Sequence, residues 1–95
     1  MIDLHNSKEV IPIRDENLEK LRNIIRAVLD MGEDQEVDTV RQMTSRRWDS
    51  LAQISMIAAV EAEFGVSIET QKYERFTSFE AVRILLEEKG VLPVS

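Results

Sequence analysis

The chain has 95 residues, and its 12 lysines and arginines against 18 aspartates and glutamates give a formal charge of −6. This length fits one domain, and 43% hydrophobic with 32% charged residues is typical of a folded domain rather than a disordered chain. Cysteine is absent, which excludes disulfides, a thiolate nucleophile and cysteine-ligated metals. His5 is the only histidine, so little is available for metal binding or histidine-based catalysis.

No targeting segment is apparent in the sequence. The longest apolar run, residues 56–60, is far shorter than the about 20 residues that a membrane-spanning helix needs. The opening Met1-Ile2-Asp3-Leu4-His5 has neither the basic region nor the apolar region of a secretory signal. We therefore expect a cytoplasmic protein without a membrane span.

The first predicted helix runs from about Asp15 to Asp30. Its apolar residues recur at helical spacing and form one stripe: Leu18, Leu21, Ile25 and Val28. Gly32 is expected to supply a left-handed stop. We expect residues 1–14 to form an N-terminal extension, residues 15–90 the folded domain and residues 91–95 a tail.

A long polar connection, residues 33–48, follows the first helix. We expect Val37, Val40 and Met43 to hold it against the core. So long a connection in a small domain is unusual and often functional.

The second predicted helix opens at Asp49-Ser50 and ends at Phe64-Gly65. Asp49 is a good N-cap, and Ser50 with Gln53 has the spacing of a capping box if the helix begins one residue later. A helical turn is expected near residues 70–75. The last helix begins with the capping-box sequence Thr77-Ser78-Phe79-Glu80 and ends at Lys89-Gly90. These elements predict an all-α bundle of three main helices and one short helix.

The second helix carries apolar residues on two nearly opposite sides. One side holds Met56, Ile57, Val60 and Phe64, and the other holds Leu51, Ile54, Ala58 and Ala62. Two interpretations remain open: neighbouring helices bury both sides, or one side faces the core and the other awaits another protein.

The sequence Trp48-Asp49-Ser50-Leu51, followed by Glu61-Ala62-Glu63-Phe64-Gly65-Val66 and Thr77, resembles the acyl carrier protein family over about residues 18–88. The resemblance, to carriers of the free-standing type, implies a small four-helix bundle. It also implies a 4'-phosphopantetheine arm on the serine that opens the second helix, holding acyl or aminoacyl groups as thioesters. A phosphodiester there would sit at a helix N-terminus, where the free N–H groups and the helix dipole favour an anion.

The resemblance assigns roles to particular residues. Ser50 is the attachment site, with Asp49 and Leu51 completing the cofactor-binding triplet, and Asp49 is expected to contact the modifying enzyme. Leu51, Ile54 and Ala58 match partner-facing positions. The positions that match the core, and that can also wall a pocket for an acyl chain, are Met56, Ile57, Val60 and Phe64.

The family also implies partners for this chain. A phosphopantetheinyl transferase would attach the arm from coenzyme A with Mg²⁺. Acyl- or aminoacyl-loading and acyl-processing enzymes would then use it, in fatty-acid, polyketide or related specialised biosynthesis. The carrier itself supplies no catalytic group, and we expect it to be a monomer that is not an enzyme.

Several positions depart from the family pattern. Ala52, Ser55 and Ala62 occupy positions that are often acidic, which argues against the usual fatty-acid synthase enzymes as partners. Arg46 and Arg47 precede the serine, either as solvated charges or as partners of the arm's phosphate.

Two further residues near the motif each have two interpretations. Trp48 either anchors the loop or contacts the arm. Glu61 is either simply solvated or recognised by a basic partner.

Two functions of other classes also fit parts of the sequence. Residues 58–67 also fit the first helix and turn of a DNA-binding helix-turn-helix, with residues 68–76 as the recognition helix. The charge of −6 argues against that function, because phosphate contacts need a basic face. A helical interaction module without a prosthetic group is the other alternative.

Overall fold

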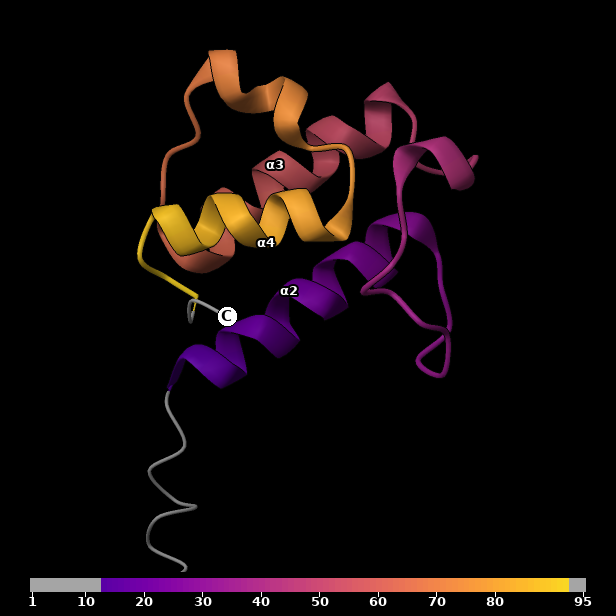
Figure 1. Cartoon of the computed structure of the whole chain (residues 1–95), viewed down its shortest axis with the longest axis horizontal. Helices are drawn as coiled ribbons and strands as arrows, with labels where there is room; N and C mark the ends of the chain where they lie inside the picture. The colour runs from indigo at the N-terminus through magenta and orange to yellow at the C-terminus, as the bar shows by residue number, and fades with distance from the viewer. Residues whose placement is uncertain (1–12, 93–95) are drawn as a thin grey trace, which may run out of the picture.

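The computed structural model describes residues 13–92 of the chain, and in this part it is helical. Three α-helices, α2 (Ile13–Leu29), α3 (Ser50–Phe64) and α4 (Phe79–Glu88), are joined by segments containing the 3-10 helices η1 (Gln42–Thr44) and η2 (Thr70–Arg75). In Figure 1, α2 (indigo) passes beneath α3 and α4, and η2 (orange) lies at the opposite end of the view. The predicted bundle of three main helices and one short helix is confirmed; η1 is additional to it.

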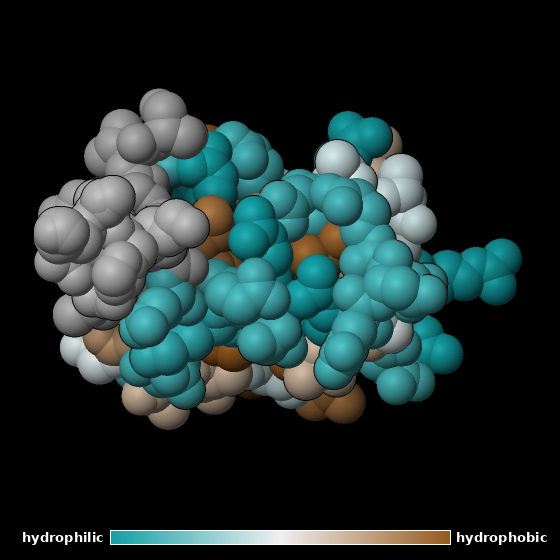
Figure 2. Space-filling model, turned by 90° about the horizontal axis from the view of Figure 1, so that it is seen from below, coloured by the Kyte–Doolittle hydropathy of each residue, from teal (hydrophilic) through white to brown (hydrophobic). Residues whose placement is uncertain are grey.

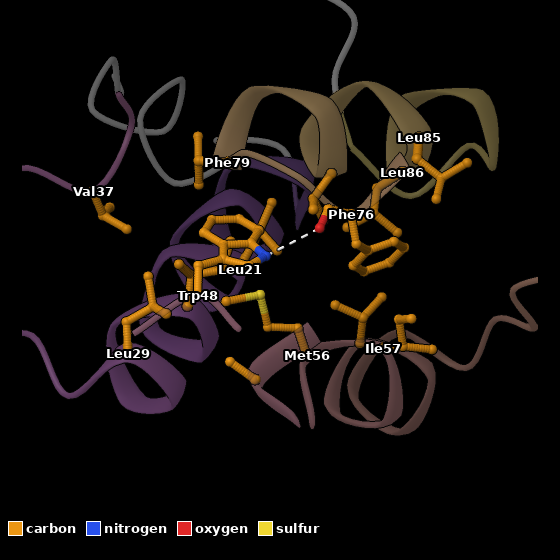
Figure 3. Close-up of a cluster of buried hydrophobic side chains, with 14 of the residues drawn as sticks. Leu21, Leu29, Val37, Trp48, Met56, Ile57, Phe76, Phe79, Leu85 and Leu86 are labelled. Carbon is orange, nitrogen blue, oxygen red and sulfur yellow. Dashed lines mark hydrogen bonds between the residues drawn. The ribbon is translucent and has the colours of Figure 1, made fainter. Parts of the chain in front are cut away.

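The core lies where α2, α3 and α4 meet (Figure 3). Its largest fully buried side chains come from all three helices and from the connections between them: Trp48, Phe76, Phe79, Leu21, Ile25, Leu29, Met56, Leu85 and Leu86. The indole of Trp48 lies at the centre of this cluster, and its Nε1–H donates to the carbonyl oxygen of Phe76 at 3.0 Å. Residues from both connections thus complete the core that the helices form.

The end of α2 differs from the prediction. Asp30, not Gly32, takes the left-handed conformation, with φ of 58°. The N–H of Met31 then donates to the carbonyl oxygen of Arg26 at 2.8 Å, as in a Schellman ending. Aspartate is one of the few residues other than glycine that tolerates this conformation, so the helix ends at Leu29, three residues before the glycine.

The connection between α2 and α3 is held at several points. Val37 is buried and Val40 packs against the core, as predicted, but Met43 is 92% exposed and holds nothing. The guanidinium of Arg22 donates to both carboxylate oxygens of Asp38, at 2.9 and 3.0 Å, and this ion pair lowers the pKa of Asp38. The connection is therefore an ordered structure tied to α2.

The connection also pairs with the segment before α4. The N–H of Gln42 donates to the carbonyl oxygen of Thr77 at 2.8 Å, and the N–H of Phe79 donates to that of Val40 at 3.1 Å. Ser78, rather than Thr77, is the N-cap of α4, and its hydroxyl accepts from the N–H of Ala81. The predicted capping box of Thr77 and Glu80 therefore does not form, because position N3 is Ala81, which cannot bond back to the N-cap.

The domain limits also differ from the prediction. Helix α2 begins at Ile13, inside the predicted extension. At the other end Leu92 is 1% exposed, and the carbonyl oxygen of Val91 accepts from the side chain of Asn17 at 2.9 Å. Residues 91 and 92 are therefore packed on the bundle and do not belong to a tail. His5 and the remainder of the predicted extension lie outside the described residues.

Residues 13–92 contain neither a membrane-spanning helix nor a cluster of metal-ligating side chains. No helix in this range combines the length and the apolar character needed to cross a membrane. The same residues contain no group of three or more acidic or histidine side chains placed to hold a metal ion. On the face shown in Figure 2, hydrophilic side chains predominate, and hydrophobic ones are visible in the hollows between them.

Candidate functional site

Ser50 is the first residue of α3 and is exposed. The helix begins here because the preceding Asp49 is extended, with φ of −98° and ψ of −172°, and its carboxylate accepts from the N–H of Ala52 at 2.8 Å. This is the N-cap predicted from the sequence, and the alternative capping box starting at Ser50 does not form. The serine therefore stands at a fixed helix start with its side chain reachable from solvent.

The first turn of α3 leaves room for an anion. A helix has four N–H groups at its start without partners inside the helix. Asp49 takes two of them, the N–H of Ala52 through its carboxylate and the N–H of Gln53 through its carbonyl oxygen at 2.9 Å. Among the described residues, the N–H groups of Ser50 and Leu51 have no acceptor. A phosphodiester on Ser50 would meet these donors and the positive end of the helix dipole, so the residues fit that group.

The residues just before Ser50 have distinct environments. Trp48 is 2% exposed and bonded to Phe76, so it anchors the connection as the first interpretation held. Arg47 is exposed and its guanidinium lies 3.3 Å from the carboxylate of Asp30. Arg46 is exposed and forms no ion pair within residues 13–92. Two cations thus stand beside the serine on a chain whose overall charge is negative.

The structure distinguishes the two sides of α3. Met56 and Val60 are fully buried and Ile57 is 3% exposed, whereas Leu51 is 75% and Ile54 53% exposed. The alanines that continue the second side, Ala58 and Ala62, are also exposed. The hypothesis of one core side and one exposed side is confirmed, and the hypothesis of burial on both sides is wrong. The exposed side begins directly after Ser50.

The carboxylate of Glu61 has a partner within the chain. It accepts from the backbone N–H of Ile68 at 2.8 Å, so it fastens the connection after α3 and is not simply solvated. Gln53, which lies eight residues earlier in α3, has a similar role. Its side-chain amide donates to the carbonyl oxygens of Tyr73 at 2.8 Å and Phe76 at 3.2 Å. This role of Gln53 was not predicted, because nothing in its spacing identifies which carbonyl oxygens lie opposite.

The η2 segment is also tied to α4 by surface ion pairs. Arg75 donates to both carboxylate oxygens of Glu88 at 3.0 Å, and Lys89 lies 2.9 Å from the carboxylate of Glu69. These cations lower the pKa values of Glu88 and Glu69. With only six residues in 3-10 conformation, η2 does not form the recognition helix of a helix-turn-helix, and that alternative is wrong.

A surface depression of about 500 Å³ lies beside the start of α3. Asp49 and Leu51, the two neighbours of Ser50, both line it, and α2 contributes Ala27 and Val28. Neither α2 residue was recognised from the sequence as part of a site. They reach it only because α2 packs against α3, which sequence spacing does not reveal.

Comparison with known proteins gives three relatives of the same name. The chain is 34% identical over 76 residues to "Acyl carrier protein" of Petrotoga mobilis, a match covering 80% of this chain and 89% of that protein. It is 27% identical over 75 residues to "Acyl carrier protein, chloroplastic" of Brassica napus, covering 79% of this chain and 56% of the relative. It is 25% identical over 76 residues to "Acyl carrier protein 5, chloroplastic" of Arabidopsis thaliana, covering 80% and 55%.

The chain therefore spans about half the length of the two chloroplastic relatives. No family model matches the chain. No solved structure matches it significantly.

Proposed function

The chain belongs to the acyl carrier protein family, and from that membership we propose that it carries acyl or aminoacyl groups on a 4'-phosphopantetheine arm attached to Ser50. The observation that supports this site is the position of Ser50, exposed as the first residue of α3 and preceded by the N-cap Asp49. When bound, the arm supplies the terminal thiol on which such groups are held as thioesters. The carrier itself supplies no catalytic group; it positions the arm and leaves Ser50 accessible to enzymes.

The residues around Ser50 have separate roles in this proposal. Asp49 holds the helix start, so that a transferase can reach the serine hydroxyl without unwinding α3. The N–H groups of Ser50 and Leu51 face the negative phosphodiester. Because Arg47 is already paired with Asp30, Arg46 is the cation more readily available to the phosphate.

We assign partner binding to the exposed side of α3. Leu51, Ile54 and Ala58 form an apolar strip that begins beside the attachment point. Covering exposed apolar side chains with a partner favours binding, by about 25 cal/mol for each Å² of apolar surface buried. Glu61 stands at the edge of this strip, where a basic partner would compete with the N–H of Ile68 for its carboxylate.

The proposed partners are a phosphopantetheinyl transferase, using coenzyme A and Mg²⁺, and the enzymes that load and process the carried group. The pathway is fatty-acid, polyketide or a related specialised biosynthesis, and the location is cytoplasmic. Of the positions that are often acidic in the family, Ser55 and Ala62 are exposed on α3, whereas Ala52 is buried and faces the core. The absence of acidic residues at the two exposed positions favours a specialised pathway.

Attachment of the arm is tested by intact mass. The chain is incubated with coenzyme A, Mg²⁺ and a broad-specificity transferase that loads a control carrier. We expect the parent to gain the mass of one phosphopantetheine group and Ser50→Ala to gain none. Ser55→Ala is the matched control, because Ser55 is also an exposed serine in α3, and it should load like the parent.

A parent chain that is folded but gains no mass would contradict the assignment of Ser50. The interaction module without a prosthetic group would then be the better account of the fold. Loading of Ser50→Ala would instead show that another residue carries the arm.

A further inference from the structure

Two surface depressions lie in succession between α2 and α3 and share Ala27. The first, of about 500 Å³, is lined by Ala27, Val28, Arg47, Asp49, Leu51, Ala52 and Ser55. The second, of about 330 Å³, is lined by Lys20, Asn23, Ile24, Ala27 and Glu63. Together they form a groove along the α2–α3 seam, which we call the seam groove.

The seam groove starts at the attachment point. Asp49 and Leu51, on either side of Ser50 in the chain, line its first part. Glu63, near the last turn of α3, lines its second part and forms an ion pair with Lys20 at 3.5 Å. From Leu51 to Glu63 the helix rises roughly 18 Å, so the groove follows almost the whole of α3.

We propose that the phosphopantetheine arm lies in the seam groove when the carrier is not engaged with an enzyme. This inference rests on the proposed function, since it takes Ser50 as the attachment site. An extended arm reaches roughly 16 Å from its phosphorus atom to its sulfur atom, by ordinary bond lengths. The arm can therefore follow the groove past Ala27 into the second depression.

The lining of the seam groove suits the chemistry of the arm. Arg47 lines its start and, although its guanidinium is paired with the exposed Asp30, adds positive charge near the phosphodiester, which Arg46 also approaches in the chain. Farther along, the hydroxyl of Ser55 and the side-chain amide of Asn23 can bond the two amide groups of the arm. Val28 and Ile24, both partly buried, offer apolar contact to its methyl and methylene groups.

The opposite seam of α3, toward η2, is already occupied by internal contacts. Gln53 donates to the carbonyl oxygens of Tyr73 and Phe76, and Glu61 accepts from the N–H of Ile68. An arm entering that seam would have to break these hydrogen bonds. On the α2 side the second depression holds the ion pair of Lys20 with Glu63, but both side chains are about half exposed and such a pair contributes little. Ala27 at the middle of the groove is a small exposed residue that leaves it open.

The first test compares amide chemical shifts of the apo and arm-loaded forms of the full chain, after intact mass has shown complete loading. We expect shift changes beyond residues 49–52, at Ser55 on α3 and at Asn23, Ile24 and Ala27 on α2. Changes confined to residues 49–52 would mean that the arm extends into solvent and would overturn the proposal. Changes at Tyr73 and Phe76 would place the arm in the η2 seam and would also overturn it.

The second test measures how fast the thiol of the loaded chain reacts with a maleimide, with coenzyme A as the free-thiol reference. We expect the parent to react several-fold more slowly than coenzyme A. Ala27→Trp fills the middle of the groove and should restore the rate to within about twofold of coenzyme A. Ile84→Trp, at an exposed position of α4 outside both depressions, should react like the parent.

Far-UV circular dichroism checks that both variants fold, and the shift comparison in the parent needs neither variant. A parent thiol as reactive as that of coenzyme A would overturn the proposal. Failure of loading is seen earlier, in the intact mass. That result would refute the proposed function itself, so the two failures are distinguishable.

Discussion

The indole N–H of Trp48 donates to the carbonyl oxygen of Phe76 at 3.0 Å, across 28 residues of sequence and inside the core. This hydrogen bond links the residue two positions before Ser50 to the end of η2. It therefore fixes the entry into α3, and with it the position of the attachment serine, from the far side of the bundle.

Replacing Trp48 tests this link. Trp48→Phe removes the donor but keeps most of the ring, and we expect the free energy of unfolding to fall by about 1–2 kcal/mol. Gln53 also donates to the Phe76 oxygen, so this acceptor keeps one partner. Trp48→Ala should cost about 3–5 kcal/mol because it leaves a large cavity. Urea unfolding followed by circular dichroism measures both; equal stabilities of the three proteins would refute the anchoring role.

The two sides of α3 predict opposite effects of the same substitution. Ile54→Asp lies on the exposed side and should change the free energy of unfolding by less than about 0.5 kcal/mol. The same variant should slow transfer of the carried group by a partner enzyme, because a charge replaces an apolar contact. Val60→Asp, on the buried side, should prevent stable folding, because it buries an unpaired carboxylate. If Ile54→Asp no longer unfolded cooperatively, this side of α3 would belong to the core.

The pair of Arg22 and Asp38 predicts a pH dependence. The pKa of Asp38 lies below its ordinary value of 3.8, chiefly because Arg22 donates hydrogen bonds to its carboxylate. A lowered pKa in the folded state stabilises the fold above the unfolded value, and this contribution is lost as the pH falls through the folded value. Both side chains are partly exposed, so screening limits the contribution to about 1 kcal/mol or less.

Asp38→Asn should therefore lower stability at pH 7 and have a progressively smaller effect between pH 4 and pH 2. Urea midpoints measured at a series of pH values give this difference directly. Asp34→Asn, at an exposed residue of the same connection, serves as the control. An effect of Asp38→Asn that stayed constant down to pH 2 would argue against the ion pair as its source.

The end of α2 predicts a stabilising substitution. Asp30 has a φ of 58°, which glycine adopts without steric cost. Asp30→Gly should therefore raise the free energy of unfolding by up to about 1 kcal/mol, because the exposed ion pair with Arg47 contributes little. Gly32→Ala is the comparison, since Gly32 is not left-handed and alanine there incurs no such penalty. Thermal unfolding of both variants measures the difference, and a lower midpoint for Asp30→Gly would contradict the explanation.

Much of the fold was predictable from local patterns. Asp49 and Gly65 mark the ends of α3 as expected, because a cap needs a particular side chain or backbone conformation at one position. The two sides of α3 followed from helical spacing alone, although that spacing left open whether the second side was buried or exposed. That choice depends on how many helices surround α3, which is a property of the whole bundle.

The errors arose where distant contacts decide the outcome. Met43 has an apolar side chain of the kind found in cores. The pairing of Gln42 with Thr77, however, fixes the backbone beside it and leaves the Met43 side chain exposed to solvent. Leu92 was assigned to a tail because Gly90 ended the periodic pattern, and only the packed bundle shows that it is buried. The seam groove could not be predicted either, since its walls come from helices separated by the long connection.

The hydrogen bonds that fasten the η2 region to α3 and to Trp48 bear on which residues of this region can be substituted during evolution. Trp48 and Gln53 donate to main-chain carbonyl oxygens of residues 73–76, which every residue type supplies. Glu61 accepts from the N–H of Ile68, which every residue type except proline supplies. The exposed side chains of this segment, unlike the buried Ile68 and Phe76, can therefore be replaced without loss of these hydrogen bonds. A new surface could be introduced between α3 and α4, in nature or by design, while the serine and its helix stay in place.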